Sequence, residues 1–141
     1  MGEAKLEPLR VDFDRRVKLE FHGSDISSDG GLLPTRELDH ALELTEAGGE
    51  VLSETRRGKN TRHLLVGFLR QSVFGRLAGY EDVNDAERLS HDPVMRAIVD
   101  RKGLDRMTAS TSQMGRFETE WLTTDSNLAA LSDLSGVWID R

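Results

Sequence analysis

Apolar and polar residues first form a regular pattern close to the start of the chain. Apolar residues alternate with charged or polar ones through Val17, Leu19 and Phe21. This period of two is typical of a strand with one buried face. We therefore predict a strand within residues 11–22, which pairs as a hairpin with a neighbouring strand at residues 9–13.

The pattern changes to helical spacing after residues 23–31, which are rich in Gly, Ser and Asp and predict a loop. The apolar residues at helical spacing are Leu32, Leu33, Leu38, Ala41, Leu42 and Leu44. Ser28 or Asp29 is placed to cap this helix. We expect Gly48 and Gly49 to interrupt it, with another short helical turn beyond them.

The strongest helical pattern covers residues 61–78. Its apolar positions are Leu64, Leu65, Phe68, Leu69, Val73, Leu77 and Ala78. We predict that this helix forms the centre of the core. Gly67, Gly75 and Gly79 each weaken a helix by up to about 1 kcal/mol relative to Ala, so we expect them to lie where another helix approaches closely.

Four more helical segments complete the pattern. They are predicted at residues 82–89, 93–99, 111–122 and 126–139. Asp92 stands before Pro93 and is placed to cap the second of them. Ser110 and Gln113 have the form of a capping box for the third. Residues 101–109 show no apolar period and predict a connector.

The last predicted helix has an apolar stripe of Leu128, Leu131 and Leu134 and begins at Ser126 or Asn127. Together these elements predict a mostly α fold: a short N-terminal β-strand or hairpin followed by a compact bundle of about five to six helices. We divide the chain into an N-terminal arm at residues 1–24, a helical domain at residues 25–124 and a C-terminal helix at residues 125–141.

The composition is that of one ordinary globular domain, because 37% of the 141 residues are hydrophobic and 31% are charged. No apolar run reaches the roughly 18 residues that span a bilayer, and the N-terminus lacks the basic and apolar regions of a signal peptide. We therefore expect a cytoplasmic protein without membrane contact. The chain has no cysteine, and its four histidines show no metal-ligand spacing, so no metal or other cofactor is predicted.

The formal net charge of −6 opposes indiscriminate binding to nucleic acid, so any contact with DNA has to be local. One basic cluster stands out, formed by Arg56, Arg57, Lys59 and Arg62 just before the strongest helix. Such a cluster is typical of a solvated loop between helices. The alternative is a phosphate-binding clamp, which the free backbone N–H groups at the start of the helix would assist.

A second candidate for DNA contact is the exposed side of the helix at residues 111–122. Gln113 and Arg116 on this side are residue types that read base edges and phosphates, while Met114, Phe117 and Trp121 face inward. With the helix at residues 93–99, it is compatible with a helix-turn-helix. The connector is longer than in the compact motif, and a plain packing helix has the same pattern.

Glu81, Asp82 and Asp85 form an acidic cluster that invites comparison with a metal site. Two-metal phosphoryl transfer uses carboxylates in this way. Carboxylates at a helix N-terminus also cap free N–H groups and offset the helix dipole, which explains the cluster without a metal. No nucleophile motif, phosphate-binding loop or dinucleotide fingerprint is present, so the residues themselves do not indicate an enzyme.

Five segments, taken in order, resemble the N-terminal portion of bacterial insertion-sequence transposases with a DDE acidic triad. They are Ser28-Asp29-Gly30-Gly31-Leu32-Leu33, Gly79-Tyr80-Glu81-Asp82-Val83-Asn84-Asp85, Leu89-Ser90-His91-Asp92-Pro93, Ser112-Gln113-Met114-Gly115-Arg116-Phe117-Glu118 and Leu131-Ser132-Asp133-Leu134-Ser135-Gly136-Val137-Trp138-Ile139-Asp140. Their agreement in order is more specific than any single segment. The resemblance covers the chain from about Asp25 to Arg141.

The resemblance implies that the triad lies on strands of a ribonuclease-H-like domain beyond Arg141. No catalytic residue of that family can therefore be placed on this chain, and Mg²⁺ is implied only for the full-length family. The implied function is a non-catalytic transposase segment that binds or positions double-stranded DNA at the element ends. The alternative is a truncated remnant that acts only as an oligomerisation module, with itself or with intact transposase subunits.

Overall fold

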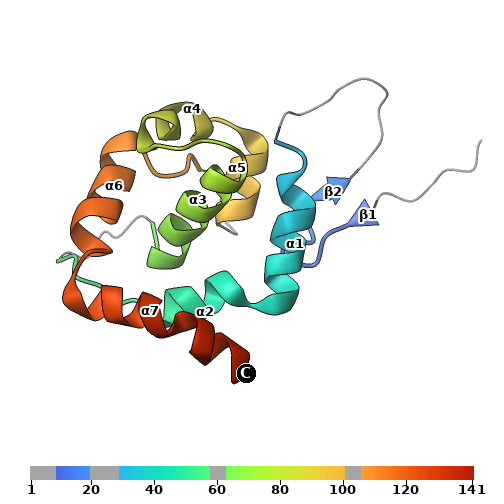
Figure 1. Ribbon diagram of the computed structural model, residues 1–141. Coiled ribbons are helices and arrows are strands. Elements are labelled where there is room, and N and C mark those ends of the chain that lie inside the picture. Colours follow the sequence, from blue (N-terminus) through green and yellow to red (C-terminus); the bar gives the residue numbers. More distant parts are fainter. Residues whose placement is uncertain (1–8, 20–28, 58–62, 101–105) are drawn as a thin grey trace, which may run out of the picture.

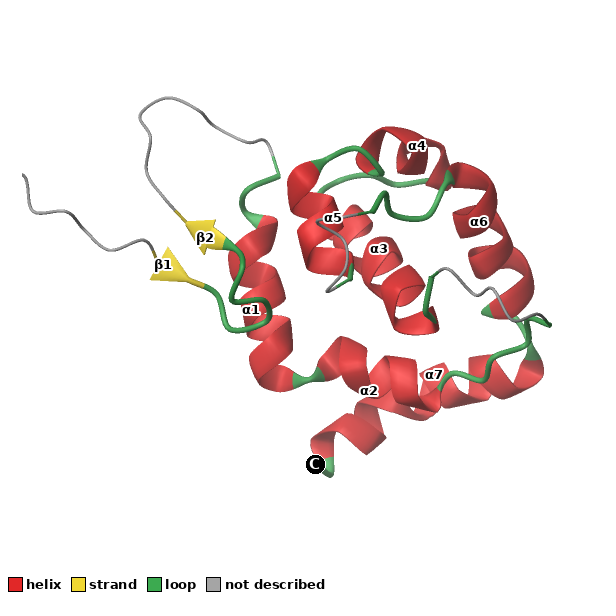
Figure 2. Cartoon of the chain, turned by 180° about the vertical axis from the view of Figure 1, so that it is seen from behind, coloured by secondary structure: helices red, strands yellow, loops and turns green. Residues whose placement is uncertain are grey.

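The computed structural model describes residues 9–19, 29–57, 63–100 and 106–141, and within them it confirms a mostly helical fold with a short N-terminal hairpin (Figure 1). Seven α-helices lie in these ranges. The elements are β1 (Leu9–Arg10), β2 (Lys18–Leu19), α1 (Leu32–Leu42), α2 (Leu44–Val51), α3 (Leu65–Leu77), the 3₁₀ turn η1 (Val83–Asp85), α4 (Ala86–Leu89), α5 (Pro93–Val99), α6 (Thr111–Arg116), the π-helical turn η2 (Phe117–Trp121) and α7 (Asp125–Ile139). Helix α3 lies in the middle, as predicted, and the hairpin lies at the opposite edge from α6 (Figures 1 and 2).

The hairpin is antiparallel, with Leu9 opposite Leu19, and is joined to α1 by polar contacts. The Glu37 carboxylate accepts hydrogen bonds from the backbone N–H of Asp12 at 2.9 Å and of Phe13 at 3.4 Å. These bonds satisfy backbone donors that the two-residue strands leave free. The predicted hairpin is confirmed, and α1 holds it in place.

The predicted helix at residues 32–44 is two helices that meet at an elbow. Glu43 adopts the left-handed conformation with φ of 55°, which ends α1 and begins α2. The Asp39 carboxylate accepts hydrogen bonds from the backbone N–H and the hydroxyl of Thr45 and closes the elbow. Leu32 and Leu33 are buried as expected, whereas Leu38 is 58% exposed because the inner side of α1 carries Arg36.

Two glycines allow α2 to lie directly against α3. A Cβ atom on Gly48 would lie 2.5 Å from Leu69 Cδ2, and one on Gly49 would lie 2.7 Å from Val66 Cβ. The expectation that this pair interrupts the helix is therefore wrong. Helix α2 continues through both residues, because only glycine permits the approach.

The close approaches expected at the glycines of α3 are not found. A Cβ atom on Gly67 would make an ordinary contact of 3.7 Å with Val99, and one on Gly75 would meet nothing within 4 Å. Gly79 has φ of 90° and turns the chain at the end of α3, a conformation that glycine adopts without strain. Leu64 and Leu77 are exposed, and α3 begins at Leu65, later than predicted.

The buried apolar residues form two clusters on either side of α3. The first joins the hairpin, α1, the end of α3 and α5, and consists of Val11, Phe13, Leu32, Leu33, Phe74, Leu89, Met95, Ile98 and Val99. The second joins α2, the start of α3, α4 and α6, and consists of Leu52, Leu65, Phe68, Leu69, Ala86, Ala109, Met114 and Phe117. Helix α3 contributes to both, so the two halves of the core depend on its position.

Helix α7 packs along α2 and is held at both ends by hydrogen bonds. At its start, the side chain of Thr124 is the cap, and the helix begins at Asp125, one residue before the predicted start at Ser126. The Asn127 side chain is instead buried and bonds to the backbone of Ser53 and Trp121. Near its end, the Trp138 indole N–H donates to the carbonyl oxygen of Leu42 at 2.6 Å.

Replacing Gly49 by Ala should destabilise the protein by about 1–3 kcal/mol, because the new methyl group would overlap Val66, whose β-branched side chain cannot turn away. Urea unfolding followed by circular dichroism measures this change. Gly136→Ala in α7 is the matched control: no atom lies within 4 Å of its Cβ position, so it should stabilise by up to about 1 kcal/mol. Equal effects of the two substitutions would show that the α2–α3 approach is not tight.

Candidate nucleic-acid interface

Arg56, the first member of the predicted basic cluster, is a structural anchor. Its side chain is 14% exposed, and its guanidinium lies 5.3 Å from the ring centroid of Phe68 and 5.0 Å from that of Trp121. Nε and Nη2 bond to the Glu54 carboxylate, and Nη1 donates to the carbonyl oxygen of His63 at 2.9 Å. All three nitrogens are therefore engaged. The hydrogen bond from Arg56 also lowers the pKa of the Glu54 carboxyl.

Arg57 follows directly in the chain and is exposed. Lys59 and Arg62, the other members of the cluster, lie outside the described residues. Within the described residues, the fold thus gives Arg56 and Arg57 different surroundings. Arg56 fixes the backbone of the segment against the aromatic rings, and its neighbour Arg57 presents its charge to solvent.

Helix α6 begins with the predicted capping box. The Ser110 hydroxyl accepts from the backbone N–H of Gln113, whose side-chain oxygen in turn accepts from the N–H of Ser110 at 3.0 Å. The helix buries Met114 and Phe117, as expected, and leaves Arg116 exposed at its last position. Gln113 therefore serves the cap with its oxygen, and Arg116 is the charged side chain that α6 exposes.

The segments that carry the exposed residues Arg57 and Arg116 lie side by side. Contact between Arg56 and Trp121 places the segment that carries Arg57 beside the π-helical turn that continues α6 from Arg116. These segments lie away from the hairpin (Figures 1 and 2).

The helices do not form the compact helix-turn-helix. In that motif the two helices are joined by a tight turn of three or four residues. Here α5 packs against α1 and α3, and α6 packs against η1 and α4. Between them lie residues 100–110, of which 101–105 are outside the described residues.

The acidic side chains have structural partners. The Asp82 carboxylate caps η1 by accepting from the N–H of Asn84 at 2.7 Å. Asp29 does not cap α1, whose first turn has Gly31 at the cap position and no side-chain bond; its carboxylate accepts from the Tyr80 hydroxyl instead. Within the described ranges, no three His, Asp or Glu side chains are grouped as metal ligands. These residues do not fit a Mg²⁺ site.

Sequence patterns did not reveal a polar cavity of about 430 Å³ between the hairpin, the α1–α2 elbow and α3. Buried Arg36 donates to the carbonyl oxygen of Ile98, and buried Arg70 donates to Thr45 and Glu46. Burial, followed by the nearby charge of Arg70, lowers the pKa of Arg36 to about 10. In the sequence, the only sign of this cavity is Arg36 on the inner side of α1. Apolar periodicity alone does not distinguish such a buried arginine from one on the surface.

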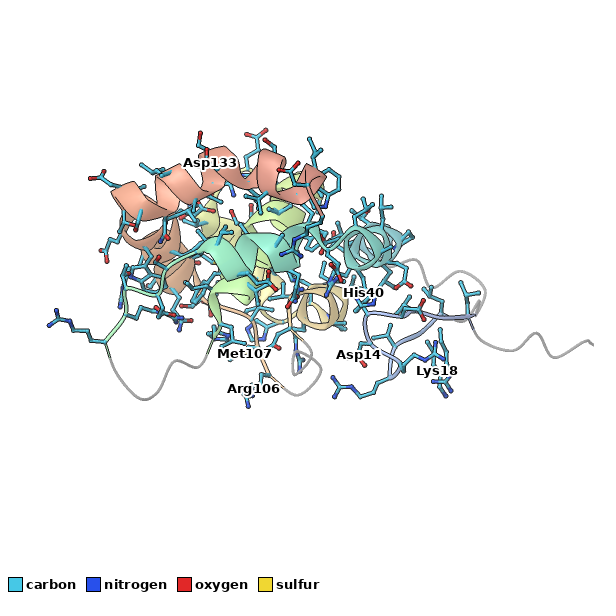
Figure 3. The ribbon with its side chains drawn as sticks, turned by 90° about the horizontal axis from the view of Figure 1, so that it is seen from below. Asp14, Lys18, His40, Arg106, Met107 and Asp133 are labelled. Atoms are coloured by element: carbon cyan, nitrogen blue, oxygen red, sulfur yellow. The ribbon has the colours of Figure 1, made fainter. Side chains whose placement is uncertain are left out.

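This cavity does not suit a phosphate group, although it contains two arginines. The exposed carboxylates of Asp12, Glu43 and Glu46 stand in its wall and would repel an anion. Figure 3 shows His40, which also lines the cavity, beside the hairpin, whereas Asp133 points outward from α7 at the far side. We assign the cavity to the junction of hairpin and helices, and not to the candidate nucleic-acid interface.

These features describe a helical domain with exposed arginines on adjacent segments and, among the described residues, no grouping of metal ligands. No described helix is long and apolar enough to cross a membrane. The family model for transposase DDE domain group 1 matches residues 9–141, so the chain belongs to this family of DDE transposases. No curated protein and no solved structure matches the chain.

Replacing Arg56 by Ala should destabilise the protein by about 1–3 kcal/mol, because it removes two cation–π contacts and the hydrogen bonds to Glu54 and His63. Thermal and urea unfolding measure the loss. Arg57→Ala, one residue further, is the control and should leave stability within about 0.5 kcal/mol of the wild type. Similar losses for both variants would show that the segment is not anchored through Arg56.

Proposed function

We propose that this chain is a non-catalytic segment of a DDE transposase that binds or positions double-stranded DNA at the ends of the mobile element. The observation that carries the proposal is the family match over residues 9–141. The described part of the chain offers no group of carboxylates that could hold the metal ions of strand transfer. The role that we infer in DNA transposition is binding or positioning of DNA.

The proposed interface is formed by the adjacent segments that carry Arg57 and Arg116. A net charge of −6 requires local contact, and DNA affinity arises where cations replace the counterions of the phosphates. The backbone before Arg57 is held beside η2 by its anchored neighbour Arg56, so less conformational entropy is lost when Arg57 binds. Lys59 and Arg62 follow in the sequence and complete the proposed clamp.

Within this interface we assign phosphate contact to Arg116 and not base reading to Gln113. The side-chain oxygen of Gln113 is occupied by the capping box, and a bidentate contact with adenine needs both the oxygen and the nitrogen of the amide. Contacts to phosphates position a protein without reading sequence. The proposed role of this segment is therefore to position the DNA.

An oligomerisation module is the second candidate, and exposed apolar side chains favour it. Leu131, Leu134 and Trp138 are half-buried, and Leu134 lies beside Gly48 of α2, so α2 covers part of the expected apolar face of α7. Leu38 on α1 and Ile139 at the end of α7 remain exposed, at 58% and 76%. Such residues favour contact with a second copy or with intact transposase subunits.

The double variant Arg57→Ala, Arg116→Ala should bind an element-end duplex about tenfold more weakly than the wild type, because two phosphate contacts are lost. The slope of log K against log salt should fall by about 2. Fluorescence anisotropy at several salt concentrations, with a scrambled duplex of equal length, measures both quantities. The matched control is Arg15→Ala, an arginine with a 72% exposed side chain on the hairpin, which should bind like the wild type.

Three outcomes separate the candidates. An equal loss for Arg15→Ala would place the interface elsewhere. Wild-type protein that shows no salt-dependent binding to any duplex would refute the DNA role. In that case, a dimer or larger assembly in light scattering, dispersed by Leu38→Glu, would support the oligomerisation module instead.

A further inference from the structure

The Arg56 guanidinium is fixed by buried groups on all sides except one edge. Its central carbon lies 5.3 Å from the ring centroid of Phe68 and 5.0 Å from that of Trp121, and Nη1 donates to the His63 carbonyl oxygen at 2.9 Å. The remaining edge, formed by Nε and Nη2, donates to the Glu54 carboxylate. Such an edge is the planar fork that binds carboxylates and phosphates through two parallel hydrogen bonds.

Glu54 is the exposed member of this ion pair. Its side chain is 40% exposed, against 14% for that of Arg56. Within the described residues, every hydrogen bond that its carboxylate accepts comes from Arg56: from Nε at 2.7 Å, from Nη2 and from the backbone N–H at 3.0 Å. An exposed ion pair contributes little to stability, so this carboxylate can rotate into solvent at small cost, whereas the rings keep Arg56 in place.

Three N–H donors of Arg56 thus converge on one position at the surface of the protein. The backbone just before it is fixed, because Asn127 bonds to the N–H of Ser53 at 2.7 Å and to its carbonyl oxygen at 3.2 Å. Arg57, exposed and next in the chain, adds a cation beside the position. A DNA phosphodiester presents two unesterified oxygens, as a carboxylate does, so it fits the same fork.

We infer that the fork of Arg56 is a further phosphate site of the interface at Arg57 and Arg116, an inference that rests on the proposed function. Glu54 occupies the site in the free chain, and a DNA phosphate replaces it when the carboxylate rotates away. Because Arg56 exchanges one anion for another, this contact releases no net counterion, and the freed carboxylate repels the DNA. Glu54 therefore lowers both the affinity and the salt dependence of DNA binding.

The test compares Glu54→Gln with the wild type by fluorescence anisotropy of an element-end duplex at several salt concentrations. Gln removes the charge but keeps an acceptor oxygen for the Arg56 N–H groups, so the variant should retain the wild-type circular dichroism. It should bind the duplex about three- to tenfold more tightly. The slope of log K against log salt should become steeper by about 1, as expected for one additional phosphate contact.

Glu120→Gln is the matched control, because Glu120 is an exposed carboxylate on η2, one residue before Trp121. It removes the same charge beside the same ring and leaves the fork of Arg56 covered, so affinity should change less than twofold. Arg56→Lys keeps the positive charge but lacks the fork. In that background, Glu54→Gln should have no larger effect than Glu120→Gln, because the coupling of Glu54 with Arg56 is lost.

The outcomes separate this site from the proposed function. If the wild type binds DNA through Arg57 and Arg116 but Glu54→Gln and Glu120→Gln bind equally, the site at Arg56 is refuted and the proposed function stands. An undiminished effect of Glu54→Gln in the Arg56→Lys background would refute the site in the same way. No salt-dependent binding by either the wild type or Glu54→Gln would overturn both.

A measurement on the wild-type complex decides the matter if Glu54→Gln does not fold. In the free chain, the hydrogen bond from Arg56 lowers the pKa of the Glu54 carboxyl. Transfer of Arg56 to a phosphate removes that bond, so DNA binding should raise the pKa of Glu54 toward its ordinary range. The carboxyl ¹³C shift of Glu54 measures this pKa. A value that stays low in the complex would show an intact ion pair and refute the site.

Discussion

The fold depends on two buried side-chain amides that bond to the backbone of non-helical segments. Gln71 in α3 donates to the carbonyl oxygen of Ala109 at 2.8 Å and accepts from its N–H at 3.0 Å. Asn127 in α7 pairs in the same two-sided way with Ser53. Ala109 and Ser53 lie in connectors, outside the helices and strands that would satisfy their backbone groups, and a buried group left unpaired costs about 1–3 kcal/mol. Each amide supplies the donor and the acceptor that a neighbouring strand would otherwise provide.

These two amides fix the positions of the segments that form the proposed interface. Gln71 fixes Ala109 just before the capping box of α6, which determines where that helix starts. Asn127 fixes Ser53, from which the chain continues to Arg56 and its contact with the rings of Phe68 and Trp121. Phe68 also stacks on Phe117, with ring centroids 5.3 Å apart. One aromatic cluster thus joins the two segments that carry the exposed arginines.

Local signals predicted most of the elements but not how the helices face one another. The capping box at Ser110 and the cap of Asp92 before Pro93 are encoded within three or four residues, and both were predictable. Gly48 and Gly49 looked like a helix end because the reason for them, the approach of α3, is remote in sequence. The apolar stripe of α1 did not predict which residues face the core, for a similar reason. The inner side of α1 buries Arg36, which donates a hydrogen bond to the carbonyl oxygen of Ile98, far away in the sequence.

The same limit applies to the candidate site. In the sequence, Arg56 and Arg57 look like equivalent members of one basic cluster. In the fold, Arg56 packs against an aromatic ring and Arg57 is exposed to solvent. Asp29 looked like a helix cap because its partner Tyr80 lies far along the chain. A charged residue acquires its role from what long-range packing brings to it. The candidate interface is an example of this, because the contact of Arg56 with Phe68 and Trp121 leaves Arg57 as the neighbouring cation that is exposed for a phosphate.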